Sequence, residues 1–295
     1  MKQLSSITRL LAVFIIMAVF LTACQKENNQ NKLTDAQEEQ AAGYSSEADA
    51  EADVVFNDVF DNVVGVNDEV GMQGVGVFGR TTAGNNASAA RGDSLNPSVC
   101  FTVSVKRLAA PAVFPVQITV DFGTGCTGRD GHIRSGKIIT TYTNRILVPG
   151  AIATTTFDNF YFDSIHVEGT HTVTNTSIAA SAGALVIPRF KITVENATLT
   201  KLNGNYTQWN SLRVITQVDG LATPLIPLDD AFSIEGSTNG KVKRGDILVA
   251  WNTEIKEPLI KRFACHWFVK GIVQAARLNI STNSPWVARL NYGDG

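Results

Sequence analysis

The sequence predicts a mainly β protein, built as an antiparallel β sandwich, an open barrel or a curved meander, with one N-terminal amphipathic helix. Three observations lead to this fold class. After residue 98, apolar and polar residues alternate in about ten short runs, as in strands that face water on one side. Glycine, asparagine and aspartate separate these runs, and these residues favour turns. One stretch before them has apolar residues at helical spacing instead.

The first 24 residues are interpreted as an export signal that is not part of the fold. Lys2 and Arg9 precede twelve consecutive apolar residues, Leu10–Leu21, a run too short to cross a bilayer but suited to a signal peptide. The segment ends in Leu-Thr-Ala-Cys at position 24, which resembles the lipobox of bacterial lipoproteins. This resemblance implies cleavage before Cys24 and a lipid on its sulfur, which would anchor the chain in a lipid bilayer. The alternative is an ordinary secretory signal followed by an unrelated cysteine.

Residues 25–46 are expected to form a disordered, acidic tether. They are rich in Gln, Asn, Glu and Ala without an apolar period, a composition typical of chains that lack a packed core. From Gln25 to Asp61, ten acidic residues stand against two lysines. Gln25 occupies the position of an aspartate that retains lipoproteins in the inner membrane, and Gln25-Lys26-Glu27 resembles the surface-export signal of lipoproteins of the Bacteroidota. Both features favour the outer membrane, on either its periplasmic or its cell-surface side.

Residues 47–97 are expected to contain an amphipathic helix over 47–64 and then a linker. Ser46 and Asp49 have the spacing of a capping box at the helix start, and Gly65 ends the helical pattern. Residues 79–97 are small and polar, as in linkers. One side of the helix is apolar, because apolar residues recur every three or four positions, at Ala52, Val55, Phe56, Val59, Phe60 and Val63.

Residues 98–295 are expected to form one antiparallel β domain. Basic residues exceed acidic ones by only four after Asp61, which is too mild an excess for a nucleic-acid-binding surface. The alternation of apolar and polar residues predicts strands at 99–106, 116–122, 137–148, 151–162, 165–175, 189–200, 206–218, 246–255 and 259–270.

Three cysteines remain if Cys24 is lipidated, and exported proteins tend to pair their cysteines. Cys100 and Cys126 flank a predicted hairpin, so we expect a disulfide between them. Cys265 is then either a buried thiol on an apolar strand or the partner of a cysteine beyond Gly295. The second alternative arises because residues 291–295 repeat the pattern that precedes Cys126, and it implies a truncated C-terminus.

The sequence predicts no catalytic residue, no metal site and no cofactor. The four histidines do not fall at ligand spacing, and the motifs of serine hydrolases, zinc proteases and calcium loops are missing. Ser94, in Asp93-Ser94-Leu95, resembles the O-glycosylation sequon of the Bacteroidota, as does Ser164, and Ser94 is expected to be the more accessible. Four carboxylates suit a glycosidase in principle but lie in turn-like segments; these are Asp158, Asp163, Asp229 and Asp230.

A longer stretch carries a further resemblance. Together with the signal, tether and helix, Asp121-Phe-Gly-Thr-Gly-Cys-Thr-Gly-Arg-Asp-Gly-His-Ile-Arg-Ser-Gly-Lys resembles uncharacterised outer-membrane lipoproteins of the Bacteroidota, over most of residues 47–295. That group implies no particular activity. We therefore expect a membrane-anchored lipoprotein with a non-enzymatic role, either binding a glycan or an envelope protein or serving a structural purpose. The alternative is a lipid- or glycolipid-handling protein that holds an acyl chain against a curved sheet, and an envelope hydrolase ranks third.

Overall fold

A computed structural model describes residues 35–64, 100–128, 130–178, 186–222, 229–262, 265, 268–278 and 287–294. The chain divides into two compact units, residues 1–40 and 41–295. In the first unit only residues 35–40 are described, and they form the first turns of a helix. The sheet and all the contacts discussed below belong to the second unit.

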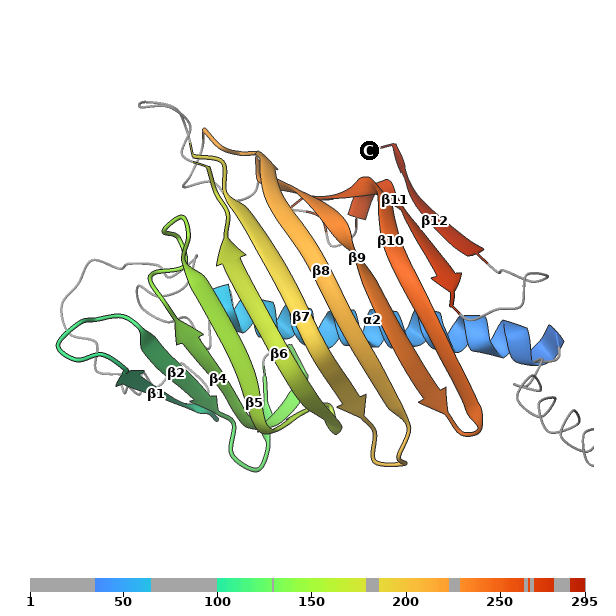
Figure 1. Ribbon diagram of the computed structural model, residues 1–295, viewed down its shortest axis with the longest axis horizontal. Coiled ribbons are helices and arrows are strands. Elements are labelled where there is room, and N and C mark those ends of the chain that lie inside the picture. The colour runs from blue at the N-terminus through green and yellow to red at the C-terminus, as the bar shows by residue number, and fades with distance from the viewer. Residues whose placement is uncertain are drawn as a thin grey trace, which may run out of the picture. The chain divides into compact units, whose positions relative to one another are not determined.

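The strands form one antiparallel sheet that does not close on itself (Figure 1). The long strands pair in the order of the chain, from β1 to β12, and the two-residue β3 pairs with β4. The sheet is therefore a meander, and the mainly β, antiparallel fold class is confirmed. The bounds are β1 Thr102–Arg107, β2 Val116–Asp121, β3 Cys126–Thr127, β4 Ile133–Tyr142, β5 Ile152–Phe162, β6 Ile165–Asn175, β7 Arg189–Thr200, β8 Tyr206–Asp219, β9 Ala231–Arg244, β10 Ile247–Arg262, β11 Phe268–Arg277 and β12 Val287–Asp294.

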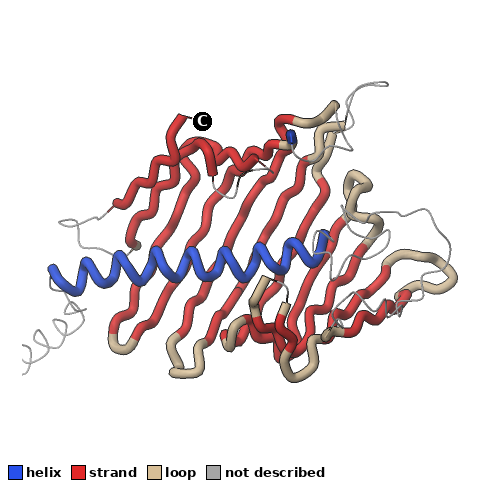
Figure 2. Tube along the Cα trace, turned by 180° about the vertical axis from the view of Figure 1, so that it is seen from behind, coloured by secondary structure: helices blue, strands red, loops and turns tan. Residues whose placement is uncertain are grey.

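One helix, α2 (Asp35–Val64), runs across the strands on one face of the sheet (Figures 1 and 2). The amphipathic helix expected near the N-terminus is therefore confirmed. Within the described part of the chain, no helical segment combines the length and hydropathy that a bilayer-crossing helix needs. The buried side chains of α2 recur every three or four positions and so form one stripe; they are Ala41, Ser45, Ala48, Ala52, Val55, Phe56, Val59, Asn62 and Val63.

The helix begins at Asp35, well before the expected start at residue 47. Residues 35–46 are therefore helical, not disordered, and Ser46 and Asp49 lie inside the helix instead of capping it. The Gln, Glu and Ala residues of this segment are good helix formers, and Ala41 and Ala48 extend the buried stripe. Residues 25–34 of the expected tether lie outside the described residues.

The core lies between α2 and the middle of the sheet. Phe56 of α2 is only 3% exposed, and three rings from β5, β6 and β8 surround it. The distances between ring centres are 6.1 Å to Phe157, 6.2 Å to His171 and 5.5 Å to Trp209. Because aromatic rings bury large areas, this cluster holds the helix on the centre of the sheet.

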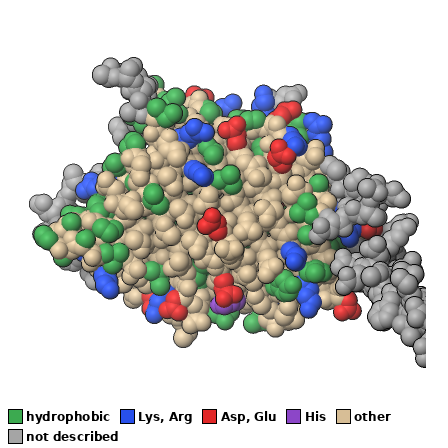
Figure 3. Space-filling view, in the orientation of Figure 1, with side chains coloured by type: hydrophobic (Ala, Val, Ile, Leu, Met, Phe, Trp, Pro, Cys, Tyr) green, Lys and Arg blue, Asp and Glu red, His purple; other side chains and the backbone are tan. Residues whose placement is uncertain are grey.

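The opposite face of the sheet is polar and mostly uncharged. Thr141 pairs with Thr154, Thr154 with Thr172, and Thr172 with Thr193 in register across four strands. Figure 3 shows this face, where charged side chains are few and scattered. Threonine suits this position because it is β-branched and carries a hydroxyl that water can solvate. The alternation of buried and wet positions expected from the sequence is therefore confirmed.

Three strands, the two-residue β3 and the longer β9 and β12, were not expected from the sequence. In β9, glycines replace apolar residues, and a Cβ atom at Gly240 would lie 2.5 Å from the ring of Trp251. Glycine is needed at this position because the Trp251 ring packs against it. Since glycine has no apolar side chain, the strand lacks the alternation of apolar and polar residues. The strand expected at 259–270 is also wrong, because β10 ends at Arg262 and β11 begins at Phe268.

The expected disulfide between Cys100 and Cys126 is confirmed. It joins Cys100, two residues before β1, to Cys126 in β3, and the two Cα atoms lie 5.3 Å apart. Cys265 is a half-buried free thiol in the structure.

Candidate functional site

The helix is fixed to the sheet by carboxylates on its flanks. Asp49 accepts hydrogen bonds from Trp209 Nε1 at 2.7 Å, from Thr238 Oγ1 at 2.7 Å and from Thr253 Oγ1 at 3.0 Å. Hydrogen bonds to a charged acceptor are stronger than neutral ones. Asp49, placed by the sequence in a capping box, is therefore a docking residue between α2, β8, β9 and β10.

Two more acidic residues of α2 meet basic side chains of the sheet. Glu51 pairs with Lys201 at 2.7 Å and with Arg244 at 3.3 Å, and Asp53 pairs with Arg213 at 2.6 Å. Burial raises the pKa of the Asp53 carboxyl, and Arg213 opposes this shift. The acidic stretch that was expected to be solvated thus finds part of its counter-charge on the sheet.

Arg134 of β4 joins the helix to the start of the sheet. Its guanidinium donates to both carboxylate oxygens of Asp58, at 3.0 and 2.5 Å, and to those of Asp130, at 3.1 and 2.5 Å. The same group lies 5.3 Å from the ring centre of Phe162. Burial raises the pKa of Asp58, whereas the hydrogen bonds from Arg134 lower that of the more exposed Asp130. Arg134, itself buried, thus links α2 to β4 and packs its guanidinium against Phe162.

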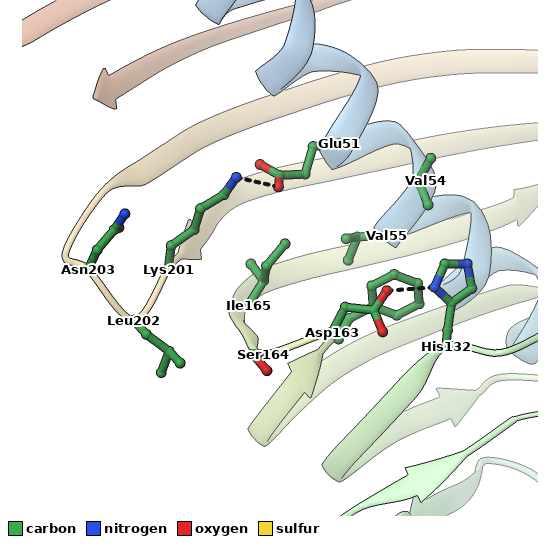
Figure 4. Close-up of a pocket in the computed structure, with 11 residues that line it drawn as sticks. Glu51, Val54, Val55, His132, Asp163, Ser164, Ile165, Lys201, Leu202 and Asn203 are labelled. Carbon is green, nitrogen blue, oxygen red and sulfur yellow. Dashed lines mark hydrogen bonds and ion pairs between the residues drawn. The ribbon is translucent and has the colours of Figure 1, made fainter. Parts of the chain in front are cut away.

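A hollow of about 570 Å³ opens beside α2, at the ends of the β5–β6 and β7–β8 hairpins (Figure 4). We call it the hairpin bowl. This volume falls within the range of about 300–1,000 Å³ that is usual for small-molecule sites. The lining residues are Glu51, Val54 and Val55 from α2, His132 before β4, Phe162, Asp163, Ser164 and Ile165 around the first turn, and Lys201, Leu202 and Asn203 around the second.

One side of the bowl carries a hydrogen-bonded pair, His132 and Asp163. His132 Nδ1 lies 2.6 Å from Asp163 Oδ2, and the backbone N–H of Ile133 donates to Asp163 Oδ1 at 2.8 Å. Because an ionised carboxylate only accepts hydrogen bonds, His132 Nδ1 is the donor. Asp163 therefore fixes the orientation of the imidazole ring.

The other side carries the Glu51–Lys201 pair, and an apolar floor lies between the two pairs (Figure 4). Val55 and Phe162 are buried in this floor, whereas Val54 is 50% exposed and Leu202 is 86% exposed. The bowl therefore combines fixed donors and acceptors with apolar surface that a ligand could cover.

The turn that carries Asp163 is conformationally strained. Asp163 and Ser164 have φ angles of 47° and 68°, the left-handed pair that a tight two-residue hairpin turn requires and that glycine or asparagine adopts more readily. In Figure 4 the Ser164 hydroxyl points away from His132. Asp163, His132 and Ser164 therefore do not form the hydrogen-bonded relay of a serine hydrolase.

The site residues considered in the sequence do not converge on one place. Cys24 and Ser94 lie outside the described residues, and Cys100 and Cys126 form their disulfide beside β1. Of the four carboxylates considered for a glycosidase, Asp163 alone is among the residues that line the bowl. The described residues contain no cluster of histidine, cysteine and carboxylate side chains that could hold a metal ion.

Sequence reasoning missed the residues that line the bowl together with Asp163. His132 was considered only as a metal ligand and set aside, and Glu51 and Lys201 were not singled out. These residues are 31, 112 and 38 positions from Asp163 in the numbering, and only the pairing of the strands and the docking of α2 bring them together. The sequence offered one signal for this site. Asp163-Ser164 stands between two alternating runs, and such a pair marks a tight turn.

Comparisons of this chain with protein-family models, with curated proteins and with solved structures found no match.

Proposed function

We propose that this chain is a non-enzymatic binding protein of the cell envelope, anchored through a lipid on Cys24, that holds a glycan in the hairpin bowl. The observation that carries the proposal is the pairing of polar groups around an apolar floor. His132–Asp163 and Glu51–Lys201 come from separate elements and face each other across Val54 and Phe162.

A neutral sugar matches this arrangement. Its ring C–H groups can cover the apolar floor, and its hydroxyls can both donate to and accept from the fixed side chains. Glu51 and Lys201 neutralise each other, and both oxygens of Asp163 already accept hydrogen bonds, from His132 and from the backbone N–H of Ile133. A small ligand also suits the volume better than an envelope protein, the other partner considered from the sequence.

A glycan array probed with the purified full chain tests the proposal. Val54→Phe should fill the bowl and weaken binding at least tenfold, because Val54 is half exposed and lines the floor. Glu47→Phe is the matched control, since Glu47 is exposed on the same helix and lines neither the bowl nor any other described hollow. An array without a bound glycan, or equal binding by both variants, would overturn the proposal.

A further inference from the structure

A second hollow, of about 440 Å³, lies on the other flank of α2. We call it the α2–β12 cavity, because residues of the helix and of strands β8 to β12 line it. The helix contributes Ser45, Ser46, Asp49, Ala50 and Asp53. Since β8 and β12 reach the same cavity, the sheet curves around this part of the helix.

The cavity follows from the sizes of the side chains along α2. The buried residues of its N-terminal half are small, whereas those of its C-terminal half are large enough to fill the space above the sheet. The small set is Ala41, Ser45, Ala48 and Ala52, and the large set is Val55, Phe56, Val59 and Val63. A helix with small side chains leaves volume beside it that the sheet alone does not fill.

The cavity has an apolar wall, on β10 to β12, and a polar side, formed by the helix together with polar side chains of the sheet. Two carboxylates, those of Asp49 and Asp53, and two guanidinium groups, those of Arg213 and Arg289, are among the lining residues, so their charges sum to zero. Arg213 pairs with Asp53 at 2.6 Å. Tyr292 adds a phenol, and its ring lies 5.3 Å from that of Phe268. The apolar wall consists of Ile255, Leu259, Phe268, Val273, Ala275 and Leu290.

Trp251 forms part of the cavity wall, so its indole fluorescence can report on a ligand there. It is 1% exposed and lines the cavity, and its indole N–H is buried without an acceptor among the described residues. A buried donor without a partner is unfavourable.

We infer that the α2–β12 cavity binds a neutral single-chain lipid of the monoacylglycerol type, with the acyl chain along the apolar wall. Its hydroxyl and ester oxygens are uncharged, and they suit the polar side of the cavity because the acidic and basic side chains there balance each other. A fatty acid shares the chain but brings a carboxylate that meets Asp49 and Asp53 without a compensating excess of positive charge. This site is separate from the hairpin bowl and does not depend on glycan binding there.

Fluorescence quenching tests this inference on the full chain, kept soluble in an amphipathic polymer so that no free detergent competes. The probe is a monoacylglycerol with a dibrominated stearoyl chain, since bromine quenches an indole that it contacts. Saturable quenching is expected in the wild type, and Trp251→Phe should remove it. The brominated fatty acid is expected to bind at least tenfold more weakly.

Variants at the rim locate the bound chain. Ala50→Phe should weaken binding at least tenfold, because Ala50 is exposed on the helix and lines the cavity. Leu290→Glu should do the same from β12, where Leu290 is 55% exposed. Glu47→Phe and Val54→Phe should bind as the wild type does. Non-saturable quenching that is equal in all variants, quenching that survives Trp251→Phe, or preference for the fatty acid would overturn the inference.

Discussion

At the scale of single residues, His171 lies in an environment that disfavours the charged form of its imidazole. It is fully buried beneath α2, stacked on Phe56, and neither ring nitrogen has a hydrogen-bond partner among the described residues. Burial lowers its pKa to about 3, because a charged imidazole would lose its hydration there. The folded protein therefore requires the neutral form of this side chain.

Acid should destabilise the protein through His171. The ordinary pKa of histidine is 6.5, so below that pH the unfolded chain binds a proton that the folded state excludes down to about pH 3. Between pH 7 and pH 5, His171 should lower the free energy of unfolding by about 2 kcal/mol. Urea unfolding at both pH values measures this: His171→Phe should lose about 2 kcal/mol less stability than the wild type, and an equal loss in both proteins would contradict the prediction.

At the residue scale, the sequence predicted some features correctly and missed others. The cysteine pair followed from spacing and an oxidising compartment, and Asp163 was correctly placed in a turn. The bond between Asp163 and His132 was out of reach, because it depends on how the first residues of β4 lie against the β5–β6 turn. The burial of His171 was also missed, because it depends on which face of the sheet α2 covers, and no local sequence pattern shows this.

At the scale of elements, α2 is the part on which both hollows depend. Its buried stripe closes the core, and its two flanks line the hairpin bowl and the α2–β12 cavity. Asp49, at the middle of the helix, accepts three hydrogen bonds from the sheet. The position of the helix should therefore be sensitive to this one carboxylate.

Asp49→Ala should lower the free energy of unfolding by about 3 kcal/mol, because it leaves the buried donors of Trp209 and two threonines without their acceptor. Glu47→Ala, an exposed position on the same helix, should change it by less than about 0.5 kcal/mol. Chemical denaturation of the three proteins at pH 7 measures both effects. Similar stability of the two variants would show that Asp49 does not dock the helix.

Strands and helical segments were predictable where the sequence shows one clear period of apolar residues. The paired strands β5 to β8 show clear alternation, and the second half of α2 shows a helical period. The first half of α2 was missed because its buried residues are alanine and serine, which a search for large apolar residues does not count. β9 was missed because Gly240 makes room for Trp251, so its role is visible only beside β10.

At the scale of the whole molecule, we propose that a lipid anchor holds a β domain with two hollows at the membrane. The acidic first part of the chain and the basic excess of the remainder, seen in the sequence, partly compensate where α2 meets the sheet. The order of the strands is also simple, because each long strand pairs with the next. The sequence predicted this class of sheet but left open whether it was a sandwich, a barrel or a meander, since alternation does not report how far a sheet closes.

The anchor is tested by Cys24→Ala. We expect the wild type to incorporate a labelled fatty acid and to sediment with membranes, and the variant to do neither, because no other attachment is proposed. Fractionation and labelling in the same cells measure both properties. A variant that stays in the membrane fraction with undiminished label would contradict the proposed anchor.

The most direct measurement of the proposed function is a nuclear magnetic resonance titration of the four histidine side chains with a glycan that the array identifies. We predict that the ring signals of His132 shift on saturation while those of the buried His171 do not, and that Val54→Phe abolishes the shift. Binding that leaves the His132 signals unchanged would contradict the claim that the hairpin bowl is the glycan site.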